Sequence, residues 1–378
     1  MSLRVSILTR EYPPSIYGGA GVHIEYLSKE VARLAEVEVR CYGDQKPGKG
    51  DIKTTGYESS AGYLKLNKGL QSVFKTIDRD LQIVGEGVDA DIVHCHTWYT
   101  HMAGIWAKLN FGVPLVVTTH SLEPLRPWKR EQLAGGYRVS SWAERTSFLD
   151  AAAVISVSQG MRADVLESYS DLDPDRVFVV KNGIDPDEFK PDQGTDVVDS
   201  LGVDRDRPLV VFVGRITRQK GLVHLVRAAQ QLDPDTQLLL LAGAPDTPEI
   251  AAEFNDAFAE LSKVRSGSVK WVQEMLPRAS VRQVLTHATV FACPSVYEPL
   301  GIVNLEAMAC ETAVVASAVG GDVLLQRLCE DFPLAGDEHR RAAAVLLLAD
   351  VGEVHPGLVQ QPYRRLPDVV LDVLGYYQ

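Results

Sequence analysis

Short runs of apolar, mostly β-branched residues alternate with longer helical patterns along the first half of the chain. These runs occupy residues 4–8, 37–41, 91–95, 114–118 and 153–157. Continuous apolar runs of this length are typical of strands in a parallel sheet that helices cover on both faces. The pattern therefore predicts a doubly wound α/β domain.

The same alternation begins again in the second half, with apolar runs at residues 208–212, 237–241, 268–272, 289–293 and 313–317. Between the two series, prolines, glycines and aspartates interrupt the periodicity, as they do in linkers. We predict an N-terminal domain of residues 1–185, a linker of residues 186–207 and a C-terminal domain of residues 208–378. Ligands of such sheets bind beyond the carboxyl ends of the strands, so we expect two Rossmann-like domains that face a cleft.

Composition and charge exclude several classes of protein. The chain has 378 residues, 46% of them hydrophobic and 23% charged, which is ordinary for a folded protein of two domains. A formal net charge of −12 disfavours nucleic acid as a partner. Lys65 and Lys68 belong to a locally basic stretch, which is either a solvated face or a site for an anionic ligand.

The five cysteines are far apart and form no CxxC pair, and no secretory leader precedes the first apolar run. No apolar stretch has the length needed to cross a bilayer. We therefore expect a cytoplasmic protein with reduced thiols and no stable membrane insertion. Interfacial association and a homodimer both remain open.

A glycine-rich loop follows the first apolar run. Gly18, Gly19 and Gly21 lie where a helix begins, and the open amides of a helix start attract phosphate or another anion. A dinucleotide fingerprint with Asp44 as the ribose ligand is one alternative, although that fingerprint turns tightly from strand to helix and this loop is long and carries two prolines. A structural turn is the other. We rank phosphate or substrate contact first.

Histidines end the third and fourth runs. His96 and His120 would lie at the carboxyl edge of the sheet, where a neutral imidazole can bond a ligand hydroxyl. A metal site would need a third ligand, and no carboxylate has a matching position in the sequence, so we expect no metal. Histidines satisfied within the core are the alternative, more so for His96 than for His120.

Two cations follow the strand that begins the second domain. Arg215 and Lys220 lie between this strand and the next helical pattern. Fixed cations in a dry site stabilise the charge that develops on a leaving diphosphate, without a metal ion. A solvated basic loop is the alternative, and Arg218 fits it best.

A second constellation follows the run at residues 289–293. Glu298 precedes a turn, Gly301 and Ile302 begin a helix, and Glu306 lies inside that helix. Helix-start amides can bind a hydroxyl or a phosphate, Glu306 can accept both hydroxyls of a ribose, and Glu298 can hold a sugar ring. For either carboxylate alone, a surface capping role is the alternative.

These two stretches, Gly-Arg-x-x-x-x-Lys-Gly and Glu-Pro-x-Gly-x-x-x-x-Glu, resemble the retaining two-domain glycosyltransferases of family 4, which have the GT-B fold. More narrowly, Thr9–Pro14, Tyr17–His23 and Val296–Cys310 are similar to actinobacterial glycogen synthases and maltose-1-phosphate synthases. Those enzymes use ADP-glucose. The resemblance ends near Gly321, after which the chain departs from the family pattern.

The resemblance and the motifs together predict a site without cofactor or metal. The catalytic residues are expected to be His120, Arg215, Lys220 and Glu298. The donor is expected to contact Gly18, Gly19, Arg215, Lys220, Glu298, Gly301, Ile302 and Glu306. The acceptor is expected to contact Tyr17, Gly21, His96, Lys65 and Lys68.

The expected reaction is retaining transfer of glucose from ADP-glucose to the 4-hydroxyl group of glucose 1-phosphate or of an α-1,4-glucan, as in glycogen or maltose-1-phosphate synthesis. UDP-glucose stays open as the donor. The atypical tail motivates one alternative, a nucleotide-sugar-binding protein with little or no turnover. A nicotinamide-dependent oxidoreductase is a third hypothesis, which rests on the glycine loop and Asp44.

Overall fold

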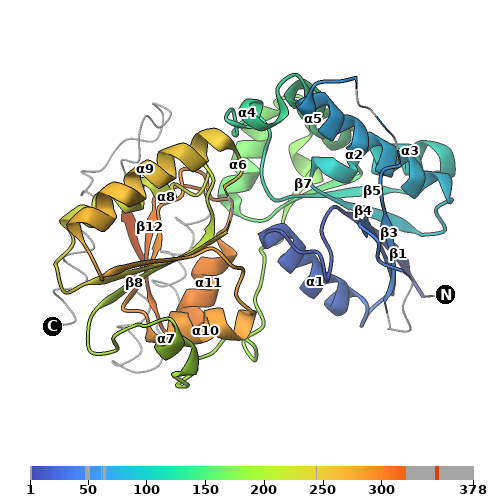
Figure 1. Cartoon of the computed structure of the whole chain (residues 1–378). Helices are drawn as coiled ribbons and strands as arrows, with labels where there is room; N and C mark the ends of the chain where they lie inside the picture. Colours follow the sequence, from blue (N-terminus) through green and yellow to red (C-terminus); the bar gives the residue numbers. More distant parts are fainter. Residues whose placement is uncertain are drawn as a thin grey trace. The chain divides into compact units, whose positions relative to one another are not determined.

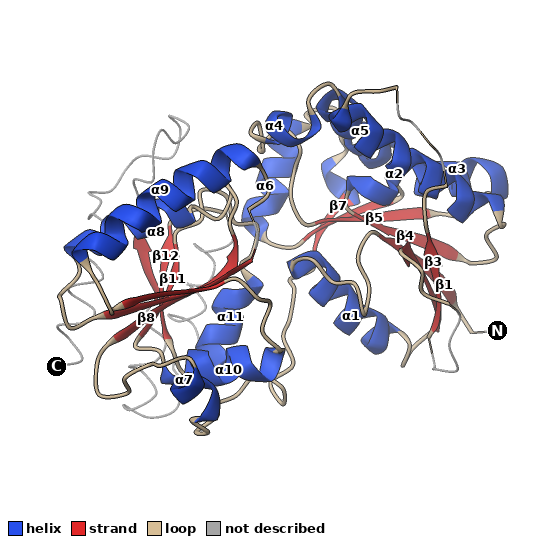
Figure 2. Ribbon diagram, in the orientation of Figure 1, coloured by secondary structure: helices blue, strands red, loops and turns tan. Residues whose placement is uncertain are grey.

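The chain forms two compact units, Met1–Asn182 and Gly183–Gln378 (Figure 1). The computed structural model describes residues 2–46, 52–60, 62, 65–243, 245–320 and 345–348. Each unit is a parallel sheet with helices on both of its faces (Figure 2). This confirms the predicted class of two doubly wound domains, whereas the predicted cleft between them stays a prediction.

The first unit contains a seven-stranded sheet of order β3-β2-β1-β4-β5-β6-β7. Its strands are β1 (Arg4–Thr9), β2 (Glu36–Tyr42), β3 (Lys53–Tyr57), β4 (Ile92–His96), β5 (Leu115–Thr119), β6 (Ala153–Ser156) and β7 (Val177–Val179). The chain moves outward from β1 to β3 and then returns to place β4 beside β1. This reversal creates a switch point, the place where open α/β sheets bind ligands.

Helices and short 3₁₀ turns connect these strands. They are α1 (Gly19–Val31), α2 (Lys68–Gly85), η1 (Trp98–Thr100), α3 (His101–Phe111), α4 (Lys129–Leu133), α5 (Gly136–Asp150), α6 (Gln159–Ser168) and η2 (Pro174–Arg176). Local sequence fixes two of the ends. The Ser158 hydroxyl accepts a hydrogen bond from the Met161 amide at the start of α6, and Gly112, with φ +70°, caps the C-terminus of α3. Ile24 of α1 packs against Val39 under the sheet.

The second unit contains a six-stranded sheet of order β10-β9-β8-β11-β12-β13. Its strands are β8 (Leu209–Arg215), β9 (Gln237–Gly243), β10 (Val269–Val272), β11 (Val290–Cys293), β12 (Ala313–Ser317) and β13 (Val345–Leu348). Its helices are α7 (Asp196–Ser200), α8 (Leu222–Ala228), η3 (Ala229–Gln231), α9 (Pro248–Val264), α10 (Arg278–His287) and α11 (Ile302–Ala309). The switch point lies between β8 and β11, which pair in parallel.

Alternating residues of β8 serve two separate cores. Phe212 packs on one face with Phe254 of α9, and Val211 packs on the other face with Val284 of α10. Because successive side chains of a strand point to opposite faces, a strand covered on both sides must be apolar throughout. That requirement is the reason why the strand could be predicted as an unbroken apolar run.

All ten predicted strands are present, with ends that differ by a few residues. Three strands were missed: β3, which is polar and contains a glycine; β7, which has only three residues; and β13. The tail beyond Gly321, expected to be atypical, lies outside the described residues apart from β13, which pairs with β12.

The segment of residues 186–207, expected to link the domains, contributes to the second unit. Phe189 is buried against Leu285 and Phe291, and Val198 of α7 is buried against Leu209. Part of the predicted linker is thus packed core. No helix in the described part of the chain has the length and apolar composition needed to cross a bilayer.

Gly221 provides a test of the turn that joins β8 to α8. It has φ +62°, and a Cβ built there would lie 1.9 Å from the carbonyl oxygen of Pro294. We expect Gly221→Ala to lower the free energy of unfolding of the second unit by about 2–4 kcal/mol, because both the backbone and the neighbouring loop would be strained. Chemical denaturation measures this difference.

Gly243→Ala is the matched control, since a Cβ at that glycine meets no atom of the described residues within 4 Å. We expect its unfolding free energy to stay within about 0.5 kcal/mol of the parent's. Equal stability of the parent and the Gly221 variant would contradict the described turn.

Candidate active site

Two loops at the switch point of the second unit are tied together. The first follows β8 and contains Arg215 and Lys220, and the second follows β11 and contains Glu298. The Val296 amide donates to the Gln219 carbonyl oxygen over 2.9 Å, which fixes one loop against the other. The structure therefore brings together the two motifs that the sequence singled out.

Lys220 and Glu298 form an ion pair. The distance from Lys220 Nζ to Glu298 Oε2 is 2.5 Å, and the Ser295 hydroxyl donates to the same oxygen over 2.9 Å. Burial alone would lower the pKa of Lys220, but the Glu298 carboxylate raises it above the ordinary value. Lys220 is therefore a positive charge fixed at the carboxyl edge of the sheet.

Arg215 is the last residue of β8 and remains partly exposed. Its Nη1 lies 3.2 Å from Asp246 Oδ1, which orients the guanidinium beside the strand end. Arg218 instead pairs with Glu253, which also pairs with Arg227. This arrangement fits the alternative given for Arg218, that it belongs to a solvated basic loop. Arg215 and Lys220 are the two cations at the end of β8.

Helix α11 carries the second predicted carboxylate. Gly301 caps the helix with φ +71°, and Ile302 is its first residue. Glu306 is buried, and its carboxyl group makes no hydrogen bond with the rest of the described chain. Burial raises the pKa of Glu306 to about 7, and Glu188 raises it while Arg278 lowers it. A buried carboxyl group without a partner is costly to a fold and marks a place where a ligand hydroxyl can bind.

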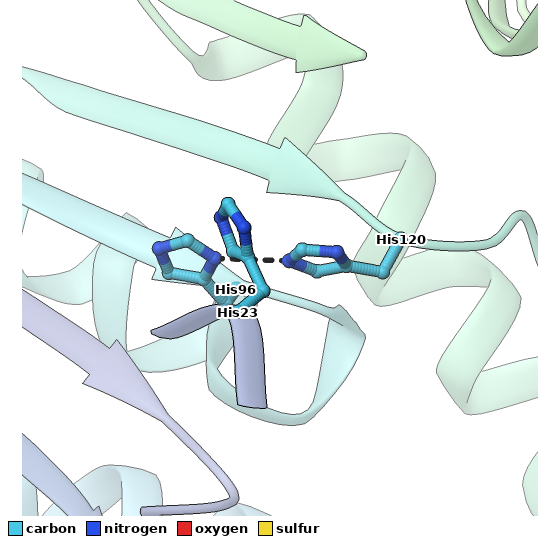
Figure 3. Close-up of side chains that lie close together, drawn as sticks. All are labelled: His23, His96 and His120. Atoms are coloured by element: carbon cyan, nitrogen blue, oxygen red, sulfur yellow. Dashed lines mark hydrogen bonds between the residues drawn. The ribbon is translucent and has the colours of Figure 1, made fainter. Parts of the chain in front are cut away.

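Three histidines meet at the switch point of the first unit (Figure 3). His96 ends β4, His120 follows β5 and His23 lies on α1. His96 Nδ1 and His120 Nε2 share a hydrogen bond of 3.1 Å, and the rings of His23 and His120 meet edge to face with centroids 4.9 Å apart. Sequence reasoning missed His23, whose only signal was its place at the end of the Tyr17–His23 motif.

These three imidazoles are neutral at pH 7. Burial lowers the pKa of His23 to about 4 and holds the pKa of His96 and His120 well below the usual value. The neighbouring histidine rings lower the pKa of His96 and His120 further. Buried His96 Nε2 has no hydrogen-bond partner among the residues that the structure describes. Neutral rings can exchange hydrogen bonds with sugar hydroxyls.

One ligand nitrogen from each of these three rings lies within 4.8 Å of the others, which would also suit a metal ion. The sequence argument that a third ligand is lacking was therefore wrong, because His23 provides one. The expectation that the protein needs no metal stays a prediction.

The glycine loop already holds an anion from within the chain. Glu11 Oε2 accepts the amides of Tyr17 and Gly18 over 2.9 and 2.7 Å. A Cβ at Gly21 would lie 2.8 Å from the Glu11 Cβ, so Gly21 lets the loop pack on α1. At the amides of Tyr17 and Gly18, an external anion would have to replace the Glu11 carboxylate. Contacts of Gly18, Gly19 and Gly21 with ligands stay predictions.

The structure does not test the other predicted acceptor residues. Tyr17 and Lys65 are exposed, and the side chain of Lys68 lies outside the described part of the chain. Asp44, on which the dinucleotide alternative depended, is exposed, and the long loop from β1 to α1 differs from the tight turn of that fingerprint. Nothing in this arrangement favours the oxidoreductase hypothesis.

Both units match known families. Residues 17–188 match the family described as Glycosyltransferase Family 4, and residues 195–323 match the family described as Glycosyl transferases group 1. The two matches fall on the first and second units in turn.

Two bacterial proteins are similar to most of the chain. The α-maltose-1-phosphate synthase of Mycolicibacterium smegmatis is 55% identical over 324 residues, which are 84% of this chain and 81% of that protein. The α-maltose-1-phosphate synthase of Mycobacterium tuberculosis is 52% identical over 322 residues, with the same coverage of 84% and 81%.

A solved structure shares the fold. A sucrose-phosphate synthase from Thermosynechococcus elongatus matches with a TM-score of 0.70 at 22% identity, over 85% of this chain and 83% of that chain. The likeness confirms the GT-B fold that the motifs predicted.

The raised pKa of Glu306 makes the stability of the folded protein depend on pH. Its pKa of about 7 lies above the ordinary value of 4.5, so the folded protein loses stability as the pH rises from 4.5 to 7. We expect Glu306→Gln, which cannot ionise, to raise the free energy of unfolding by about 1–3 kcal/mol at pH 8 and to change it little at pH 4.5. Chemical denaturation at the two pH values measures this.

The exposed Glu260 of α9 gives the control variant Glu260→Gln, which should follow the parent at both pH values. A Glu306 variant with the same pH dependence as the parent would show that this carboxyl group ionises normally in the folded state.

Proposed function

Because the chain belongs to the family 4 glycosyltransferases, we propose that this enzyme transfers glucose from ADP-glucose to the 4-hydroxyl group of glucose 1-phosphate, or of an α-1,4-glucan, with retention at the anomeric carbon. The observation that carries the proposal is the fixed cationic end of β8, where Lys220 pairs with Glu298 beside Arg215. The similarity to two α-maltose-1-phosphate synthases supports a sugar phosphate as acceptor. ADP-glucose as the donor rests on the resemblance of the sequence motifs alone.

The donor is proposed to bind along the strand ends of the second unit. Arg215 and Lys220 bind the diphosphate, because two fixed cations match its charge. Glu306, which is buried and has no hydrogen-bond partner among the described residues, accepts the ribose hydroxyls, and Glu298 accepts hydroxyls of the glucose ring. The amides of Gly301 and Ile302 at the start of α11 add donors for the diphosphate or the sugar.

The chemical step breaks the bond between the anomeric carbon and the diphosphate oxygen and forms one from that carbon to the acceptor O4. The acceptor proton moves to the departing phosphate oxygen. The acceptor therefore attacks the anomeric carbon from the face that the diphosphate leaves, and no protein nucleophile is needed. Arg215 and Lys220 stabilise the charge that develops on the ADP. His120, as a neutral imidazole, orients the glucose by a hydrogen bond.

The proposed reaction needs no metal ion, since the two cations do the work that Mg²⁺ does in other enzymes that use nucleotide sugars. The alternative is a protein that binds a nucleotide sugar with little or no turnover. It rests on the atypical tail, which lies largely outside the described residues, and measurement of nucleotide release distinguishes it from the enzyme.

The donor and the acceptor are tested by nucleotide release. ADP-glucose and UDP-glucose are each incubated with glucose 1-phosphate, with glycogen and without acceptor. We expect ADP release that depends on glucose 1-phosphate or glycogen, and slower release from UDP-glucose. Faster release from UDP-glucose would contradict the donor, and binding of ADP-glucose without release in any mixture would support the binding-only alternative.

The cations are tested by substitution. Arg215→Met and Lys220→Met should each lower kcat about 10²–10³-fold, because each removes charge stabilisation that acts in the transition state. Arg218→Met is the matched control, since Arg218 pairs with Glu253, and should keep kcat within about threefold. Circular dichroism establishes that each variant is folded.

Activity of the parent should be the same with and without EDTA. Loss of activity in EDTA and its recovery on addition of a divalent metal ion would refute a metal-independent reaction. His23, His96 and His120 would then be the candidate metal ligands.

A further inference from the structure

A second group of cations lies at the switch point of the first unit. Of its members only Arg10 belongs to a sequence motif, Thr9–Pro14, and no ligand was predicted for it. Arg10 follows β1, Tyr99 follows β4, and Arg126 and Lys129 follow β5, so three strands contribute from their carboxyl ends. The Arg10 guanidinium lies 4.4 Å from the centre of the Tyr99 ring, and Lys129 Nζ lies 5.5 Å from it. We call these four residues the Tyr99 cluster.

A buried carboxylate holds two of these cations in place. Glu123 Oε1 lies 2.5 Å from Arg126 Nη2 and 3.3 Å from Lys129 Nζ, while the Ser140 hydroxyl donates to Oε2 over 2.6 Å. Glu144 lies next to it and adds no charge at neutral pH, because burial and the charge of Glu123 raise the pKa of Glu144 to about 8. Glu123 therefore positions the cations without cancelling the charge of all three.

The other nearby carboxylate is engaged elsewhere. Glu11 follows Arg10 in the sequence, but its Oε2 is bound by the amides of Tyr17 and Gly18. Arg10 forms no ion pair or hydrogen bond within the described part of the chain, although its side chain is partly buried. Its five donors are thus open to a ligand.

The pKa of Tyr99 is sensitive to the positive charge of its neighbours. Burial alone would raise its pKa, yet the charges of Lys129, Arg10 and Arg126 outweigh burial and lower the pKa below the ordinary value. Its hydroxyl group makes no hydrogen bond to any described residue. A hydroxyl donor surrounded by fixed cations is a typical environment for a bound anion.

We propose that Arg10, Tyr99, Arg126 and Lys129 bind the phosphate group of the acceptor sugar phosphate. The identity of the acceptor rests on the function proposed above, whereas the anion site rests on this geometry. Tyr99 lies three residues after His96, so the sugar of the same ligand would reach the neutral histidines while its phosphate contacts the cations. This cluster, not the exposed Lys65, would provide the charge that an anionic acceptor needs.

Calorimetric binding tests the site directly. Glucose 1-phosphate, inorganic phosphate, glucose and ADP are titrated into the full chain and into Arg10→Gln, Tyr99→Phe and Arg10→Lys. We expect Arg10→Gln to raise the Kd of glucose 1-phosphate and of phosphate about 10–100-fold, Tyr99→Phe to raise both about fivefold, and Arg10→Lys to recover part of the loss. The Kd of ADP should not change.

Arg33→Gln is the matched control, because it removes one positive charge from an exposed site on the same unit. Its Kd values should equal the parent's, and an equal loss in this variant would reduce the effect to general charge and overturn the site. Unchanged Kd values of glucose 1-phosphate and phosphate in both Arg10→Gln and Tyr99→Phe would also overturn it.

Turnover separates this proposal from the proposed function. If the parent binds phosphate through Arg10 but does not transfer glucose to glucose 1-phosphate, the anion site stands and the assigned acceptor is wrong. If the parent uses glucose 1-phosphate and Arg10→Gln leaves its KM unchanged, the function stands and the anion site is refuted.

Discussion

The buried ion pair of Lys220 with Glu298 is the interaction on which the chemistry of the second unit depends. Taking two charges out of water costs several kcal/mol per ion, and only close geometry and further hydrogen bonds offset that cost. Ser295 supplies one such hydrogen bond, and Gly221 lets the loop after β8 approach the loop after β11. The pair consequently fixes a cation and a carboxylate at the strand ends before any ligand arrives, which is what electrostatic catalysis requires.

The first unit uses the same edge of its sheet in a different way. Burial keeps His23, His96 and His120 neutral, so they offer hydrogen bonds instead of charge. The Tyr99 cluster places positive charge at the same edge, where Glu123 holds two of the three cations. One edge thus presents a neutral part and a cationic part, which together suit the proposed ligand, a sugar phosphate with both hydroxyls and phosphate.

Much of the fold could be predicted from the sequence because strands covered on both faces must be apolar throughout. The exceptions have physical reasons: β3 is polar and β7 is very short. The position of Arg215, Lys220 and Glu298 at the strand ends could also be predicted, since they lie in compact motifs after β8 and β11. Their contact with the donor stays a prediction.

The Tyr99 cluster could not be predicted in this way. Its members come from three separate loops and meet only when β1, β4 and β5 lie side by side. The local excess of basic residues along the chain led instead to the prediction that Lys65, which is exposed, binds the acceptor. The same limitation hid His23, whose helix is distant in sequence from the strands that carry His96 and His120.

A crystal structure of the protein with ADP and glucose 1-phosphate bound tests most directly whether the two edges divide the substrates between them. We expect the diphosphate on Arg215 and Lys220 and the ribose on Glu306. The phosphate of the sugar is expected on the Tyr99 cluster. ADP bound at the glycine loop of the first unit, with Arg215 and Lys220 still empty, would contradict this division.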